Sequence, residues 1–248
     1  MDSSEQSTLV SSPTTLRERL DRYWYPKLGR NWDDTLFREV LLGYITESSV
    51  VLDVGAGAGI IPQMNFREKA ARVCGVDLDP RVVDNPFLDE GIVGKGEKLP
   101  YADETFDVVF SDNVFEHLPN PGAVFAEVGR VLKKGGYFIS KTPNRFHYVP
   151  VLAQLTPLWF HKFFNSLRGR ETEDTFPTLY RANSEQSVKK LAAEAGFSVK
   201  DIRLVEGRPE YLRFSVPSYL AGIAYERFVN STKMLRHLRV ILISVLQK

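Results

Sequence analysis

The feature that most constrains the fold of this chain is a short β-branched run followed directly by a cluster of glycines. Residues 50–54 (VVLDV) are typical of a buried strand, and residues 55–59 (GAGAG) predict a tight turn after it. Gly55, Gly57 and Gly59 can bring the backbone close to a ligand. We expect a helix next, with its free N–H groups and positive dipole end turned toward a small polar ligand.

Similar short apolar runs recur downstream, and helical stripes separate them. The second run ends in Asp77, the third leads to Glu97, and the fifth is closed by Pro143. The pattern predicts an α/β fold with a Rossmann-like, doubly wound, mostly parallel sheet whose ligands bind at the carboxyl ends of the strands. The expected elements are a helix capped by Asp33, strands at 73–76, 91–94, 106–110 and 137–140, and a helix through 124–132 stopped by Gly135 and Gly136.

The rest of the chain predicts an insertion that forms a lid, followed by the last two strands of the sheet. Residues 144–182 are rich in Pro, Trp, Phe and Arg and interrupt the alternation, so we expect an insertion after the fifth strand that contacts substrate. A helix is expected to begin at Asn183, with Gln186 three residues on, and to stop at Gly196. Residues 198–205 and 211–216 then predict an antiparallel hairpin that completes a seven-stranded sheet. The domain organisation expected is a flexible tail at 1–30, a catalytic domain at 31–216 and a helical extension at 217–248.

Composition excludes several classes of protein. A formal net charge of +1 argues against nucleic acid as the partner. Cys74 is the single cysteine, so no internal disulfide or cysteine-based zinc cluster can form, we expect no bound metal, and a reducing cytoplasmic location fits. No stretch approaches the roughly 18 to 20 apolar residues that span a bilayer.

Two carboxylates flank the predicted ligand site. Asp53 ends the first strand beside the glycines, where its charge suits a cationic amino group better than a pyrophosphate. Asp77, at the tip of the second strand, is placed to accept hydrogen bonds from ribose hydroxyls. A dinucleotide site would need a glycine three places after the second glycine of the cluster, where this chain has Ile60. An NAD-dependent oxidoreductase is therefore the weaker alternative.

Several motifs taken together carry a resemblance to a known family. The run at 51–59 resembles the first motif of class I S-adenosylmethionine-dependent methyltransferases. Residues 97–109 are similar to the segment before the fourth strand in the small-molecule, ubiquinone- and menaquinone-type branch, and residues 113–118 and 132–136 continue the likeness. The resemblance covers about residues 50 to 143. It implies S-adenosylmethionine as the cofactor and a small-molecule methyl acceptor, lipid- and glycan-linked molecules included.

The resemblance also implies which residues hold the cofactor. Adenine would lie against the segment that follows the third strand, where Lys95 replaces the Asp common in relatives. The end of the fourth strand would line the methionine part and the transferred methyl group. The implied cofactor residues, beyond Asp53 and the three glycines, are Asp77, Leu78, Gly96, Glu97, Lys98, Asp112 and Asn113.

His117 is the candidate catalytic base. Methyl transfer is an in-line displacement, so the enzyme aligns the acceptor with the methyl carbon and, for a hydroxyl or amine, removes a proton. A histidine just beyond the fourth strand can do this, although histidines at helix starts are also common structural caps. Glu116 is expected to orient a neighbour. A second alternative is a binding or regulatory protein that keeps the cofactor site without catalysis, since His117 need not be a base.

Two further segments have open interpretations. The aromatic runs at 159–161 and 176–181, which include Arg181, would suit an apolar or ring-bearing acceptor with a negative group, or simply pack under a loop. The last residues predict a basic amphipathic helix that either contacts an anionic membrane surface or packs on the sheet or on a second subunit.

The fourth strand ends in Ser-Asp-Asn-Val, without the Pro-Pro-aromatic pattern that the resemblance would imply for methylation of nucleic-acid bases. A nucleic-acid methyltransferase is therefore the weaker interpretation.

Overall fold

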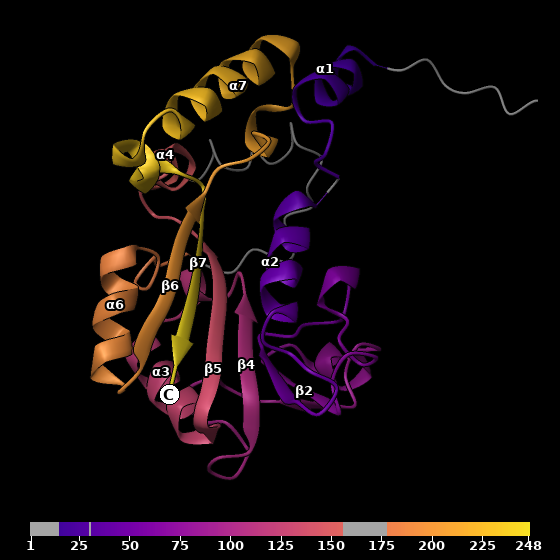
Figure 1. Cartoon of the computed structure of the whole chain (residues 1–248), viewed down its shortest axis with the longest axis vertical. Coiled ribbons are helices and arrows are strands. Elements are labelled where there is room, and N and C mark those ends of the chain that lie inside the picture. Colours follow the sequence, from indigo (N-terminus) through magenta and orange to yellow (C-terminus); the bar gives the residue numbers. More distant parts are fainter. Residues whose placement is uncertain (1–14, 30, 156–177) are drawn as a thin grey trace, which may run out of the picture.

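The computed structural model describes residues 15–29, 31–155 and 178–248, and it contains a central seven-stranded sheet. The strand order is β3-β2-β1-β4-β5-β7-β6. The pairs among the first five strands are parallel, whereas β7 is antiparallel to both neighbours. The predicted mostly parallel, doubly wound α/β sheet is confirmed (Figure 1). The strands are β1 (Val50–Val54), β2 (Arg72–Asp77), β3 (Glu90–Val93), β4 (Phe106–Asp112), β5 (Leu132–Pro143), β6 (Ser198–Val205) and β7 (Ile241–Gln247).

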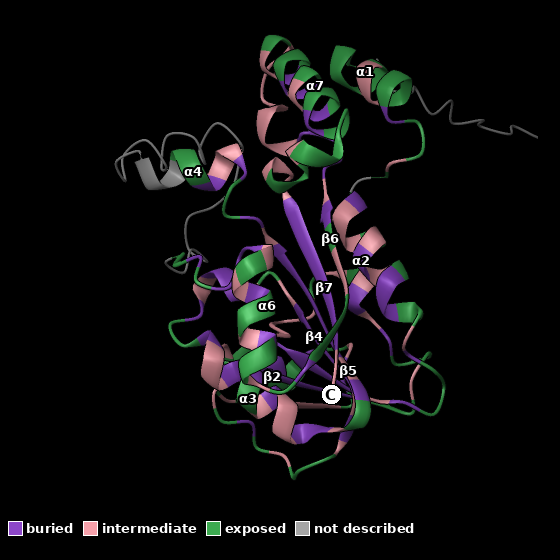
Figure 2. Ribbon diagram, turned by 60° about the vertical axis from the view of Figure 1, so that its left-hand side comes forward, coloured by how far each residue is buried: buried purple, intermediate pink, exposed green. Residues whose placement is uncertain are grey.

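Helices cover both faces of the sheet because successive strand residues point to opposite sides. In β1, Val51 packs into a cluster with α2 (Trp32–Leu42), whereas Leu52 packs into a second cluster with α3 (Pro121–Val131) and α6 (Glu185–Glu194). The side chains of Val51 and Leu52 are both fully buried. The helices lie on opposite sides of a buried sheet in Figures 1 and 2.

The prediction of a helix directly after the glycine turn is wrong, because no α-helix follows β1. A short 3-10 helix, η1 (Pro62–Met64), follows β1, and another, η2 (Pro80–Asp84), follows β2. Proline disfavours the α conformation in the residue before it, and Ile61 is accordingly extended, with φ −105° and ψ 99°. The turn therefore presents loop backbone, without an α-helix dipole behind it.

Three expected helix ends also differ. Asn31, not Asp33, stands at the N-cap of α2. Ser184 caps α6, one residue after the expected start at Asn183. α3 ends at Val131 because Leu132 is already extended and pairs with Phe106, so the two glycines expected to stop this helix lie inside β5.

The C-terminal region contains the largest correction. The expected strand at 211–216 is instead a turn that includes η4 (Glu210–Leu212), and it leads into α7 (Val216–Asn230). After η5 (Lys233–Leu238) the chain enters the sheet as β7, between β5 and β6. Residues Ile241 to Leu246 are all buried. The prediction of an amphipathic helix over the last residues is therefore wrong. The membrane-facing surface that this helix would have formed is not present, because the same residues form β7.

Residues expected to form a tail contribute to a helical cap. α1 (Leu16–Trp24) lies beside α7, beyond the carboxyl ends of the parallel strands (Figures 1 and 2). Tyr25, Tyr219 and Ile223 form a small buried cluster between them. α4 (Tyr148–Leu155) begins the insertion. Within the part of the chain that is described, no helix is long and apolar enough to cross a membrane.

Candidate active site

The glycine turn after β1 lines a cavity of about 220 Å³. Gly55, Gly57 and Gly59 all have positive φ, at 91°, 52° and 70°. A Cβ on Gly55 would lie 2.1 Å from Val114, and one on Gly59 would lie 2.3 Å from Asn85. These two glycines are required by both conformation and space, and all three predicted glycines line the cavity.

Asp77 holds this turn in shape. Its Oδ2 accepts a hydrogen bond from Gly57 N at 2.8 Å, and its Oδ1 accepts one from Asp79 N at 2.8 Å. The carboxylate thus joins the loops after β1 and β2. Leu78 is 59% exposed beside it. Sequence reasoning missed Asn85, whose Nδ2 donates to the carbonyls of Ala56 and Gly57 at 3.0 and 3.1 Å, because an Asn before Pro is indistinguishable from an ordinary turn residue.

Two buried carboxylates, Asp53 and Asp112, line the same cavity. Burial raises the pKa of Asp53 well above its usual range, and the charges of Asp112 and Asp77 raise it further. Burial also raises the pKa of Asp112 to about 7, against the lowering effect of Lys141. Asp112 Oδ2 has no hydrogen-bond partner among the described residues. A cationic ligand in this cavity would favour the ionised forms of both groups.

Lys141 on β5 is an ionic centre that sequence reasoning missed. Its side chain is completely buried, and Nζ lies 3.0 Å from Asp112 Oδ1 and 3.2 Å from Asp33 Oδ2. Asp34 completes the cluster with a third ion pair. Three carboxylates raise the pKa of Lys141 despite its burial. The only signal in the sequence was a lysine inside an apolar strand, which by itself does not identify its partners.

A second cavity, of about 360 Å³, opens at the carboxyl ends of β4 and β5. Asn113, which follows β4 directly and has φ 54°, lines it together with Glu116 and His117. Asp112, the residue before Asn113, lines the first cavity. Two successive residues at the end of β4, Asp112 and Asn113, therefore line different cavities.

His117 ends a short 3-10 helix, η3 (Phe115–His117). Its Nε2 lies 3.9 Å from Glu116 Oε1, and its side chain is 32% exposed. Glu116 is buried, which raises its pKa, and its Oε2 accepts a hydrogen bond from the hydroxyl of Thr142 at 3.1 Å. Thr142 thus fixes the Glu116 carboxylate beside the imidazole, in a buried position and not on an exposed helix face.

Several other residues predicted for the site do not line either cavity or lie outside the described residues. Gly96 packs between Val54 and Val124, but neither it, Glu97 nor Lys98 is among the residues that line the first cavity. The aromatic run at 159–161 lies outside the described residues, as do residues 176 and 177. Arg181 donates to the carbonyl of Pro119 and does not line the second cavity. No cluster of three metal-ligating side chains occurs among the described residues.

Comparison with known proteins identifies the class. Residues 52–140 match the family described as methyltransferase domain. A probable methyltransferase, ltbC of Aspergillus luteorubrus, is 31% identical over 159 residues, 55% of this chain and 55% of that protein. The 2-methyl-6-phytyl-1,4-hydroquinone methyltransferase of Synechocystis is 27% identical over 52% of this chain and 45% of its own. The chain spans between about a third and just over half the length of the curated relatives it matches.

Solved structures give the same fold. Geranyl diphosphate C-methyltransferase from Streptomyces coelicolor, solved with Mg²⁺, geranyl diphosphate and S-adenosyl-L-homocysteine, matches with a TM-score of 0.53 and 16% identity, over 87% of this chain and 77% of that one. Residues 52–140 are thus a methyltransferase domain, and the solved structure shares its fold. The domain is of the S-adenosylmethionine-dependent type that the motifs resembled, and its cofactor is S-adenosylmethionine.

Proposed function

We propose that the protein transfers a methyl group from S-adenosylmethionine to a small-molecule acceptor held in the 360 Å³ cavity. The observation that carries this proposal is that two successive residues at the end of β4 line the two cavities. Asp112 lines the glycine-rich cavity, and Asn113 lines the other one. A cofactor in the first cavity and an acceptor in the second would meet at this pair of residues.

The residues of the first cavity fit the cofactor. S-adenosylmethionine has a cationic sulfonium and a cationic amino group, and Asp53 and Asp112 provide two buried carboxylates against them. The same charges oppose the pyrophosphate of NAD, which argues against the oxidoreductase alternative. In the free protein the Asp77 carboxylate is occupied by backbone N–H groups, and its outer lone pairs remain available for ribose hydroxyls.

The described residues suggest how the chain promotes transfer. The bound cofactor supplies an electrophilic methyl group, and the two cavities align an acceptor with it. His117, in the wall of the acceptor cavity, removes a proton from the acceptor if the nucleophile is a hydroxyl or an amine. Glu116, fixed by Thr142, orients the imidazole. Glu97 and Lys98 remain candidates for contacts with adenine through their backbone.

The acceptor class is supported by the relatives. The relatives include a methyltransferase of a phytyl hydroquinone and a methyltransferase of geranyl diphosphate. Both acceptors are small molecules that carry lipid chains. We extend this class of acceptor, a small molecule with a lipid chain, to the present protein.

Thermal unfolding tests the proposal. We expect S-adenosylmethionine and S-adenosylhomocysteine to raise the melting temperature because each binds only the folded state, and NADH to leave it unchanged. Protection by NADH but not by S-adenosylmethionine would reverse the assignment. Loss of methyl transfer in His117→Ala, with the cofactor-induced shift retained, would separate a catalytic base from a cofactor contact.

A further inference from the structure

Two buried N–H donors in the wall of the second cavity lack protein partners. Trp32 and His147 both line this cavity and are 6% and 1% exposed. Trp32 Nε1 and His147 Nε2 have no hydrogen-bond partner among the described residues. A buried polar group without a partner costs free energy, so such groups in a cavity wall indicate that a ligand completes their hydrogen bonds.

The state of His147 follows from its surroundings. Val149 N donates to Nδ1 at 3.4 Å, so Nδ1 carries the lone pair and Nε2 carries the proton. Burial lowers the pKa of His147 to about 3, which keeps the ring neutral at physiological pH. Nε2 is 3.6 Å from Glu206 Oε2, beyond hydrogen-bond distance. His147 is therefore a neutral donor, as Trp32 is.

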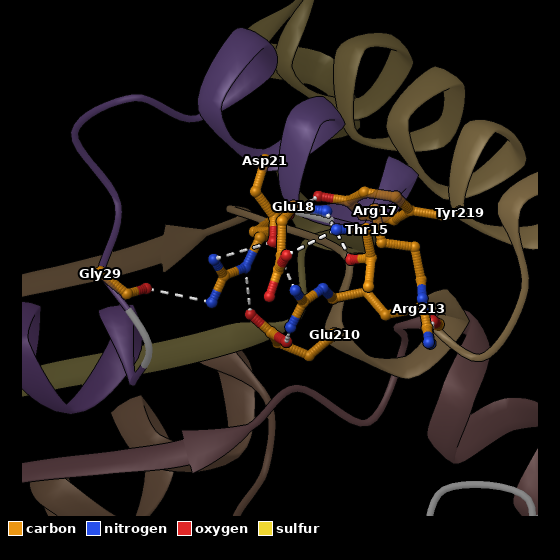
Figure 3. Close-up of polar contacts among 9 residues, drawn as sticks. Thr15, Arg17, Glu18, Asp21, Gly29, Glu210, Arg213 and Tyr219 are labelled. Carbon is orange, nitrogen blue, oxygen red and sulfur yellow. Dashed lines mark hydrogen bonds and ion pairs between the residues drawn. The ribbon is translucent and has the colours of Figure 1, made fainter. Parts of the chain in front are cut away.

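Asp33, Glu206 and Arg208 in this wall are each paired or neutral within the protein. Arg208 Nε donates to Glu210 at 2.5 Å, and its Nη2 donates to the carbonyl of Gly29 at 3.0 Å. Figure 3 shows Glu210 and Gly29 on either side of this network under the helical cap. Asp33 is paired with Lys141. Burial raises the pKa of Glu206 to about 8, so this carboxyl group is largely neutral at pH 7.

We infer that the methyl acceptor is an electrically neutral molecule whose oxygen atoms accept hydrogen bonds from Trp32 and His147. The inference rests on the proposed function, because it takes this cavity to be the acceptor site. It also revises the expectation of a negative group on the acceptor, since Arg181 lies elsewhere and Arg208 is fully engaged. Carbonyl, hydroxyl and ether oxygens on a ring fit, with Tyr148 and Tyr211 in the same wall.

Three aromatic probes of similar size and different charge test this inference. Acetophenone, benzoate and benzylamine share a phenyl ring and carry a neutral carbonyl, an anionic and a cationic group respectively. Each is titrated into ¹⁵N-labelled protein saturated with S-adenosylhomocysteine, and the indole N–H signals are followed by NMR. The chain has three tryptophans, and Trp24, which does not line this cavity, serves as the internal reference for Trp32. The Trp32 signal is assigned with Trp32→Phe.

We expect acetophenone to move the Trp32 signal downfield, with binding at least several-fold tighter than for the charged probes. Trp32→Phe and His147→Phe should each weaken acetophenone binding about threefold to tenfold, because each removes one hydrogen bond. The affinity for S-adenosylhomocysteine, measured in the same samples, should not change, which shows that the variants are folded. Equal or tighter binding of benzoate or benzylamine would overturn the inference. Failure of S-adenosylhomocysteine to bind wild-type protein would instead contradict the proposed function.

Discussion

At the scale of single residues, the charge of the cofactor cavity depends on two carboxylates whose burial opposes ionisation. Asp53 and Asp112 line one small cavity, and the pKa of each is raised mainly by loss of water. A cationic ligand reverses this penalty because it favours the ionised forms. The site therefore prefers a positively charged cofactor over a neutral or anionic one.

Asp53→Asn tests the first carboxylate. The amide keeps the shape of the side chain but removes its charge, so we expect about tenfold to hundredfold weaker binding of S-adenosylmethionine by isothermal titration. Asp103→Asn is the matched control, since that side chain is 75% exposed in the loop before β4. Equal affinities in the two variants would remove Asp53 from the binding site.

The pKa of Asp112 makes cofactor binding depend on pH. In the free protein the group is half protonated near pH 7. Because the cationic cofactor binds the ionised carboxylate, affinity should rise with pH through 7 and binding should release protons. Calorimetry at pH 6 and pH 8, in buffers of different ionisation enthalpy, measures both quantities. A pH dependence that persists unchanged in Asp112→Asn would assign it to another group.

At the scale of elements, Lys141 connects α2 to the end of β4 through ion pairs from β5. Lys141→Met would leave three carboxylates around an uncharged side chain, and breaking a buried ion pair of this kind costs about 3 to 5 kcal/mol. We expect that loss in the free energy of unfolding in urea. Lys134→Met, an exposed change on the same strand, should have little effect. Similar stabilities for both variants would show that the cluster does not hold these elements together.

β7 contributes to stability from the middle of the sheet. Leu242 is completely buried, so Leu242→Ala should lower the free energy of unfolding by about 2 to 5 kcal/mol. Leu220→Ala, at a side chain 47% exposed on α7, is the control and should cost far less. The opposite ranking in urea denaturation would contradict a buried position for Leu242 in the middle of the sheet.

These elements show what the sequence could and could not predict. β1 to β5 and the glycine turn were predictable because each strand is a β-branched or aromatic run ended by a polar or turn residue. β7 was not, because apolar residues at 241–243, 245 and 246 satisfy either a helix or a strand over so short a run. Lys141 and His147 could not be recognised, since their burial depends on partners far along the chain, such as Asp33 and Glu206.

At the scale of the whole molecule, the buried titratable groups determine how the stability of the cofactor-free protein depends on pH. Glu206 has a folded pKa of about 8, so its contribution to stability is present below its ordinary value of 4.5 and is lost as pH rises through 8. Asp112 acts in the same direction up to about 7. His147 acts oppositely, but only below its ordinary value of 6.5. Above pH 6.5 the two carboxyl groups therefore determine how the free energy of unfolding changes with pH.

We expect the free energy of unfolding to fall between pH 6.5 and pH 8 by about 1.4 kcal/mol per pH unit for each such group that is still protonated. Urea denaturation of cofactor-free protein across this range measures the slope. Glu206→Gln should make the slope shallower, because the amide does not titrate but can still accept the hydrogen bond from Val240 N. An identical slope in wild type and variant would show that Glu206 is already ionised at neutral pH.

Calorimetric titration of the whole protein with S-adenosylmethionine, and separately with S-adenosylhomocysteine, tests the central claim most directly. The two buried carboxylates and the three glycines of one cavity predict saturable binding of both ligands at one site per chain. Binding of both, weakened together by Asp53→Asn, would agree with a methyltransferase cofactor site. Absence of binding by either ligand to folded protein would contradict it.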